Sequence, residues 1–164
     1  MANKQYITFY LGEDLFGIDI LMVREINRNL DITKIERAPY FVRGLLNLRG
    51  QIVTVLDLSS RLGLEQAPRN KSSSCIVLKT SQELEHVENA DDLIECGSSE
   101  AVGLYVDQIG DVVPIDSEKI DPPAVHQSGI GKDFIEGVVQ LEERLLVTLN
   151  IAAILSTQTE SLSA

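Results

Sequence analysis

The chain has 164 residues, a formal net charge of −11 and 44% hydrophobic residues. This length and apolar content suit one ordinary domain, or two small subdomains with a common core, and they exclude wholesale disorder. The negative charge argues against nucleic acid and anionic membrane as partners, because both attract positive surfaces. No run approaches the ~18 apolar residues of a membrane span, so we expect a cytoplasmic protein without direct membrane insertion. In that compartment Cys75 and Cys96 are expected to be free thiols.

Short β-rich runs, separated by Gly, Asp and Asn, dominate the sequence. In chain order the expected strands lie within 5–11, 16–26, 45–58, 75–79, 102–115, 135–141 and 145–151. The run 45–58 reads as two strands joined by a hairpin turn at Arg49 and Gly50. Short helices are expected over 58–64 and 151–155, and Asn150 is a suitable N-cap for the second. The fold class is therefore mainly β with short helices.

The second half of the sequence resembles the first. Residues 41–58 align with 134–151, and residues 17–26 align with 103–112, with apolar residues at matching positions. The identical pairs are Phe41/Phe134, Gly44/Gly137, Leu48/Leu141 and Leu56/Leu149. A shared apolar pattern at fixed spacing indicates a shared strand order and facing, because a one-residue slip would invert every side chain. We therefore predict two similar small β-barrels of about five strands each.

The expected boundaries follow the repeat. The first barrel covers about 15–66 and the second about 75–150, with the N- and C-terminal segments packing across the halves. A polar linker, 65–74, separates them. The acidic stretch 81–100 has seven Asp or Glu and no Lys or Arg, at a place where the first half has only a short turn. We expect it to be an inserted mobile surface loop whose deletion costs little stability.

No catalytic or cofactor-binding constellation is visible. The only histidines, His86 and His126, neighbour neither a cysteine nor a metal-spaced acid, and the pair Glu142 and Glu143 reads as a polar turn. We therefore expect a protein that is not an enzyme and that binds no cofactor or metal. The alternative is a β-barrel nucleic-acid-binding protein. That function needs a basic groove with interleaved aromatic residues, and the net charge disfavours it.

Two runs resemble a known family. GIDILMVREI (17–26) and APYFVRGLLNLRGQIVTVLDL (38–58) are similar to the chemotaxis coupling protein CheW family, whose domain also occurs as the regulatory domain of CheA. The most specific part is NLRG (47–50), followed by an apolar strand that ends in Asp57 and Leu58. GLYVDQIGDVVPI (103–115), the run 134–151 and the terminal helix extend the resemblance over almost the whole chain.

The resemblance implies a single CheW-like domain over 1–164, made of two SH3-like five-stranded β-barrels that share a hydrophobic interface. It implies a non-enzymatic adaptor that couples chemoreceptor cytoplasmic tips to a CheA-type histidine kinase in bacterial chemotaxis. Such an adaptor is cytoplasmic and is recruited to membrane receptor arrays. The first barrel would dock the kinase's regulatory domain. The groove between the barrels would receive the cytoplasmic hairpin tip of a methyl-accepting chemoreceptor.

The resemblance also selects candidate residues. Glu25 and Arg49 match charged positions tied to coupling, and Arg49 is specific to the first half, because the second half has Glu142 in its place. The alternative is that Arg49 serves only to pair with Glu25. The apolar candidates are as well explained as core residues. The complete candidate set for partner binding is Glu25, Arg49, Asn47, Gly50, Val23, Ile26, Val106 and Ile109.

Overall fold

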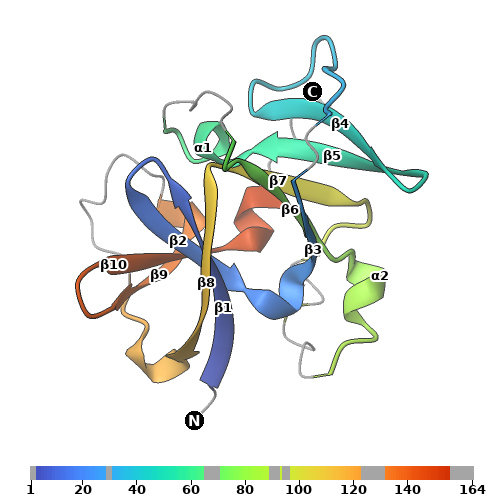
Figure 1. The fold of residues 1–164 in the computed structure, drawn as a ribbon. Coiled ribbons are helices and arrows are strands. Elements are labelled where there is room, and N and C mark those ends of the chain that lie inside the picture. The colour runs from blue at the N-terminus through green and yellow to red at the C-terminus, as the bar shows by residue number, and fades with distance from the viewer. Residues whose placement is uncertain are drawn as a thin grey trace.

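The structure is a computed structural model that describes residues 3–28, 31–64, 71–88, 93, 97–122 and 132–155. Within these ranges, ten strands form two five-stranded sheets with short helical turns between them (Figure 1). The strands are β1 (Asn3–Leu11), β2 (Asp14–Asp19), β3 (Val23–Asn27), β4 (Val42–Leu48), β5 (Gln51–Asp57), β6 (Ser74–Leu78), β7 (Val102–Val106), β8 (Gln108–Asp116), β9 (Ile135–Gln140) and β10 (Leu145–Leu149). The helical elements are η1 (Ile20–Met22), α1 (Leu58–Arg61), α2 (Ser81–Leu84), η3 (Ser117–Lys119), η4 (Lys132–Phe134) and residues 151–155.

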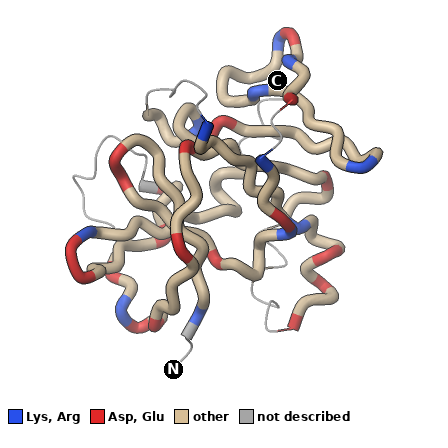
Figure 2. Tube along the Cα trace, viewed as in Figure 1, with Lys and Arg blue, Asp and Glu red and all other residues tan. Residues whose placement is uncertain are grey.

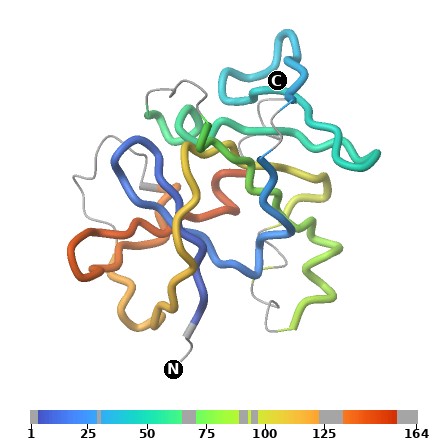
Figure 3. The backbone as a smooth tube through the Cα atoms, viewed as in Figure 1, coloured from blue at the N-terminus to red at the C-terminus, as the bar shows by residue number. Residues whose placement is uncertain are grey.

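The two sheets have the same strand order when the repeat is taken into account. One runs β8-β1-β2-β10-β9 and the other β3-β6-β7-β5-β4. The sequence repeat makes β1–β5 equivalent to β6–β10, so each sheet takes two strands from one repeat and three from the other. Two pairs of parallel strands join the repeats. Gly17 in β2 pairs with Thr148 in β10, and Gly103 in β7 pairs with Val55 in β5. Figure 3 shows this exchange, with the blue N-terminal strands beside the orange and red C-terminal ones.

The boundaries expected from the sequence, 15–66 and 75–150, therefore do not coincide with the two sheets. β2 lies in the sheet that contains β8, β9 and β10, and β6 and β7 lie in the sheet that contains β3, β4 and β5. The physical reason is that a repeat reveals which strands are alike and does not reveal which strands share hydrogen bonds. The fold class itself, mainly β with two five-stranded subdomains and short helices, is confirmed.

Equivalent residues of the repeat make equivalent contacts. The Phe41 carbonyl accepts a hydrogen bond from the Asp57 amide at 2.7 Å, and the Phe134 carbonyl accepts one from the Asn150 amide at 2.8 Å. Asp57 then caps α1 by accepting from the Ser60 amide at 3.1 Å. Asn150 caps the helix 151–155 through the Ala153 amide at 3.2 Å, as the sequence predicts. The two repeats are thus equivalent in their hydrogen bonding as well as in their pattern.

Two glycines occur at matching positions of the repeats, Gly44 and Gly137, and at each of them another segment of the chain approaches the backbone closely. A Cβ on Gly44 would meet the carbonyl of Thr33, and one on Gly137 would meet the carbonyl of Asp121. Thr33 forms a bridge with the residue after Gly44, and Asp121 forms one with the residue after Gly137. Each bridge covers the edge strand of its sheet, β4 or β9. Both glycines are therefore requirements of the fold.

The hydrophobic core has three parts. A central cluster draws on both sheets and includes Phe9 and Phe16 from one and Leu56, Ile76 and Leu104 from the other. Two smaller clusters lie within the individual sheets. Full burial of each large apolar side chain stabilises the fold by about 1.5–3 kcal/mol. The central cluster is the predicted hydrophobic interface between the two subdomains.

A buried arginine lies where the repeats meet. The Arg61 guanidinium carbon lies 5.0 Å from the ring centre of Phe41 and 4.3 Å from that of Phe134. Its Nε donates to the Ile154 carbonyl at 3.0 Å, and Nη2 donates to the Ala153 carbonyl at 3.2 Å. Burial lowers the pKa of Arg61 below its ordinary value. Arg61 thereby ties α1, the two equivalent phenylalanines and the terminal helix together.

The expectation of a mobile loop over 81–100 is wrong for its first residues. Thr80 and Glu83 form a capping box that begins α2, and Leu84 is fully buried in the central cluster. The Ser81 amide donates to the Ser98 carbonyl at 2.9 Å, which holds the returning chain against the helix. Figure 2 shows acidic positions along α2. The segment is acidic, yet it adds a core residue to the fold.

Several expectations fall outside the described residues. They concern the linker residues 65–70, most of 89–96 with Cys96, and the stretch 123–131 with His126. Cys75 is described and is a buried free thiol, as expected. Burial, followed by the charge of Glu25, raises the pKa of the Cys75 thiol to about 12. No helix in the described part of the chain is long and apolar enough to cross a membrane.

Candidate partner-binding site

The first feature of the site is the turn between β4 and β5. Leu48 pairs with Gln51, so Arg49 and Gly50 alone form the loop, with φ angles of +52° and +88°. Positive φ at both central residues is the signature of a type I′ hairpin turn, whose twist matches that of the strands. The Asn47 side-chain oxygen accepts from the Gly50 amide at 2.9 Å and supports the turn. The predicted hairpin is confirmed, and it assigns a structural role to Asn47 and Gly50 beside the predicted binding role of Arg49.

Arg49 has a backbone conformation that is unfavourable for residues other than glycine. The left-handed conformation costs an ordinary residue roughly 1–2 kcal/mol, and the first position of a type I′ turn is typically Asn, Asp or Gly. A positive-φ arginine at an exposed hairpin tip therefore contributes something other than turn stability. Backbone strain of this kind concentrates at functional sites. The sequence repeat has Glu142 at the equivalent place, so the arginine is specific to the first hairpin.

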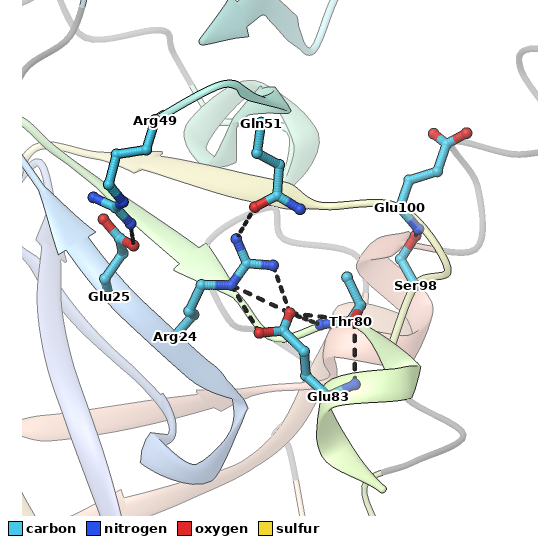
Figure 4. Close-up of polar contacts among 8 residues, drawn as sticks. All are labelled: Arg24, Glu25, Arg49, Gln51, Thr80, Glu83, Ser98 and Glu100. Atoms are coloured by element: carbon cyan, nitrogen blue, oxygen red, sulfur yellow. Dashed lines mark hydrogen bonds and ion pairs between the residues drawn. The ribbon is translucent and has the colours of Figure 1, made fainter. Parts of the chain in front are cut away.

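The Arg49 side chain reaches a neighbouring strand. Its Nη2 donates to the Oε2 of Glu25 on β3 (Figure 4). The Arg49 side chain is 72% exposed and that of Glu25 is 24% exposed. An exposed pair of this kind is worth about 0.2–1 kcal/mol, which is too little to account for the residue on structural grounds alone. The sequence-predicted residues Glu25 and Arg49 are thus brought together.

Beside this pair lies a second polar link, which sequence reasoning missed. The Arg24 Nε donates to Glu83 Oε2 at 3.0 Å, Nη2 donates to Oε1 at 2.5 Å, and Nη1 donates to Gln51 Oε1 at 2.5 Å (Figure 4). The hydrogen bond from Arg24 is the main reason why the pKa of Glu83 is lowered. A signal was present in the sequence, because Thr80 and Glu83 have the spacing of a capping box, which predicts a helix start.

These contacts border a groove of about 780 Å³ that is lined by residues of β3, of the β4–β5 turn and β5, and of the segment between β6 and β7. Polar side chains make up most of its wall, and Ile52, which is 54% exposed, is the main apolar one. The lining residues are Arg24, Arg49, Gln51, Ile52, Thr54, Thr80, Gln82, Glu83, Ser99, Glu100 and Ala101. In the described ranges no group of three or more His, Cys, Asp or Glu could hold a metal ion. The groove presents hydrogen-bonding groups and charge.

The four apolar candidates differ in exposure. Val106 has no exposed surface, because it lies in β7 between β6 and β5 and packs into the central cluster. The expectation that Val106 contacts a partner is therefore wrong in this structure, and Val106 is a core residue. Val23 and Ile109 are partly buried against the same cluster, and Ile26 is 38% exposed. A partner-binding role for these three stays a prediction.

Comparisons with known proteins agree with this fold. Residues 5–159 match the CheW-like domain. The chain is 31% identical to the chemotaxis protein CheW of Treponema pallidum over 94% of this chain and 83% of that protein. It is 29% identical to CheW of Klebsiella aerogenes over 96% and 84%. The crystal structure of the scaffolding protein TtCheW from Thermoanaerobacter tengcongensis has a TM-score of 0.73, with 30% identity over 91% of this chain and 85% of that one. This chain belongs to the CheW-like domain family.

Proposed function

We propose that the chain is the adaptor that couples chemoreceptor cytoplasmic tips to a CheA-type histidine kinase. Membership of the family supports the less specific role, that of a chemotaxis scaffolding protein without enzymatic activity. In this proposal the protein is cytoplasmic and is recruited to membrane receptor arrays. Its partners are the kinase's regulatory domain and the hairpin tip of a methyl-accepting chemoreceptor. It works by presenting surfaces.

The observation that carries the proposal is the conformation and exposure of Arg49. The residue is held at positive φ on a hairpin tip, and most of its side chain faces solvent. A guanidinium has five donors in a rigid fork, so it can bond Glu25 and still offer donors to a partner's carboxylate or carbonyl. Charge-assisted bonds to a carboxylate are short and directional, which suits a contact that has to fix orientation. These features support a role for Arg49 in binding a partner at the protein surface.

The remaining contacts of the proposal are apolar. Ile26, next to Glu25 on β3, and Ile52, next to Gln51 on β5, are both exposed enough to pack against a partner. In many peptide complexes an amphipathic helix packs its apolar face against exposed apolar side chains. We assign Val23 and Ile109 to the same receptor contact, because both reach the surface at the margin of the central cluster.

Calorimetric titration of the full chain with a CheA-type kinase tests the proposal. We expect micromolar or tighter binding by the wild type and a loss of at least about 30-fold in affinity on Arg49→Glu. That loss corresponds to the ~2 kcal/mol lower bound for breaking a buried interfacial charge pair. Arg144→Glu is the matched control, since Arg144 lies in the exposed turn of the equivalent β9–β10 hairpin. Equal affinity for both variants would contradict the assignment of Arg49.

A further inference from the structure

The first step concerns how firmly α2 is held. The Thr80 side chain accepts from the Glu83 amide at 3.2 Å, and Glu83 Oε1 accepts from the Thr80 amide at 3.0 Å. Leu84, the next residue, is fully buried in the central cluster. These contacts fix the helix start to the core and to the chain that follows β6. The Glu83 carboxylate therefore has a defined position, even though its side chain is 39% exposed.

The second step is the transfer of that position to β3. Arg24 contacts both carboxylate oxygens of Glu83 through Nε and Nη2, which is the two-point geometry that orients a guanidinium. The Arg24 side chain is 18% exposed, so water competes weakly for it. The third donor group, Nη1, then bonds Gln51. Glu83 therefore determines where Arg24 presents its remaining donors.

The third step links Arg24 to the hairpin tip. Gln51 follows Gly50 directly and begins β5. In the sheet, β6 and β7 lie between β3 and β5, so β3 has no backbone ladder with the hairpin. Two side-chain links span this distance, Arg24 to Gln51 and Glu25 to Arg49 (Figure 4). The Arg24 link thus holds the turn that carries Arg49 against β3.

The repeat provides an internal comparison. The position equivalent to Arg24 is Gly110, and the position equivalent to Gln51 is Arg144, so the second subdomain cannot form this link. The equivalent of the 81–100 segment is a two-residue turn between β1 and β2. A five-stranded subdomain of this fold therefore forms without the Glu83–Arg24–Gln51 chain. The link is specific to the subdomain that carries Arg49.

We infer that Arg24 and Glu83 are positioning residues for coupling, through which the acidic insertion sets the orientation of Arg49 toward the kinase. The inference rests on the proposed function, because it assigns a purpose to the orientation of Arg49. In this view the insertion holds the β4–β5 turn in position through Glu83 and Arg24. We therefore expect changes in this segment to alter the affinity for the kinase through the position of Arg49.

Glu83→Gln is the most direct variant. Glutamine keeps the capping box, because its side-chain oxygen can still accept from the Thr80 amide, and it removes the charge that orients Arg24. Glu85→Gln is the matched control, since it removes the same charge from an exposed residue just after α2. We expect Glu83→Gln to weaken kinase binding by roughly threefold to tenfold, which lies in the lower part of the range of coupling between contacting residues. Arg24→Gln, which removes the link from the other side, is expected to show the same loss.

A binding cycle with Arg49→Ala separates positioning from a merely structural role. If Arg24 and Glu83 act through Arg49, Glu83→Gln has less than about a twofold further effect on kinase affinity once Arg49 is alanine. The change that Glu83→Gln makes in the urea midpoint of unfolding is expected to be the same in both backgrounds. An equal loss of affinity in both backgrounds would overturn the inference and leave Arg49 in place. A wild-type affinity for Arg49→Ala would overturn the proposed function as well.

Discussion

Leu84→Ala tests whether the acidic insertion is part of the folded core. The leucine is the last residue of α2, in a segment whose composition predicts a solvated loop, and none of its surface is exposed. The chain returning to β7 packs directly on it, because a Cβ on Gly97 would lie 2.9 Å from the leucine Cδ1 atom. Truncation therefore removes core contacts from the insertion, from the central cluster and from the returning chain.

The size of the effect follows from this burial. Leu→Ala substitutions at fully buried sites lower the free energy of unfolding by about 2–5 kcal/mol, and more where the surroundings cannot collapse into the space. We expect about 3 kcal/mol, within this range, because Leu84 is fully buried in the central cluster. For a chain of this length each kcal/mol lowers the melting temperature by about 2–4 °C. The expected decrease is therefore about 6–12 °C.

Urea unfolding followed by far-ultraviolet circular dichroism measures this free energy, and a thermal melt gives the midpoint. The matched control is Glu85→Ala, one residue further along and exposed, for which we expect a change within about 0.5 kcal/mol. A loss below about 1 kcal/mol for Leu84→Ala would show that the insertion is not anchored. The packing of α2 described above would then be refuted.

Three further outcomes are expected. Arg49→Asn is expected to keep or raise the free energy of unfolding while it weakens kinase binding. Relief of roughly 1 kcal/mol of left-handed backbone strain offsets the loss of an exposed ion pair of about 0.2–1 kcal/mol. A stability loss above about 1 kcal/mol would argue against the strain. At neutral pH we expect the wild type to be more stable than Glu83→Gln, because only the ionised carboxylate binds Arg24. This difference should vanish as the pH falls below 4.5 and through the lowered folded-state pKa of Glu83. Urea unfolding at several pH values checks this. In a Cys96→Ser variant, Cys75 is expected to resist alkylation near pH 8, because its pKa is raised to about 12 and it is buried; rapid native-state labelling would contradict this.

The sequence predicts the repeat and the hairpin turn between β4 and β5 well, because both rest on local patterns. The apolar spacing around Phe41 and Phe134 indicates equivalent strands, and their carbonyls make equivalent hydrogen bonds. The two-residue turn at Arg49 and Gly50 follows from the chain length between two apolar runs. Such features depend on neighbours in sequence, and one chain is sufficient to recognise them.

The pairing of strands is not predictable in the same way. β2 and β10, and likewise β5 and β7, pair in parallel across the two repeats, and this exchange leaves every apolar pattern unchanged. The pattern around Val106 fits a core role and a partner-binding role equally for a related reason, because a strand that is buried on both faces reads as a continuous apolar run. Its burial depends on β7 being a central strand, which is a property of the sheet order.

The insertion shows a different limit. Net acidity and low apolar content predict a solvated segment, and this average hides the contribution of a single residue, Leu84. The T-x-x-E spacing of Thr80 and Glu83 carried the information that a helix begins there. The partner of Glu83, Arg24, is distant in sequence, and only the fold brings the two together. Long-range ion pairs of this kind leave no local pattern.

Receptor-stimulated kinase activity tests the central claim most directly. Membranes that contain a chemoreceptor are combined with a CheA-type kinase and with wild type, Arg49→Glu or the control Arg144→Glu. We predict that Arg49→Glu unfolds at nearly the same urea concentration as wild type and fails to support stimulation, whereas Arg144→Glu supports it normally. Normal stimulation by a folded Arg49→Glu protein would contradict the claim that this hairpin tip couples receptor to kinase.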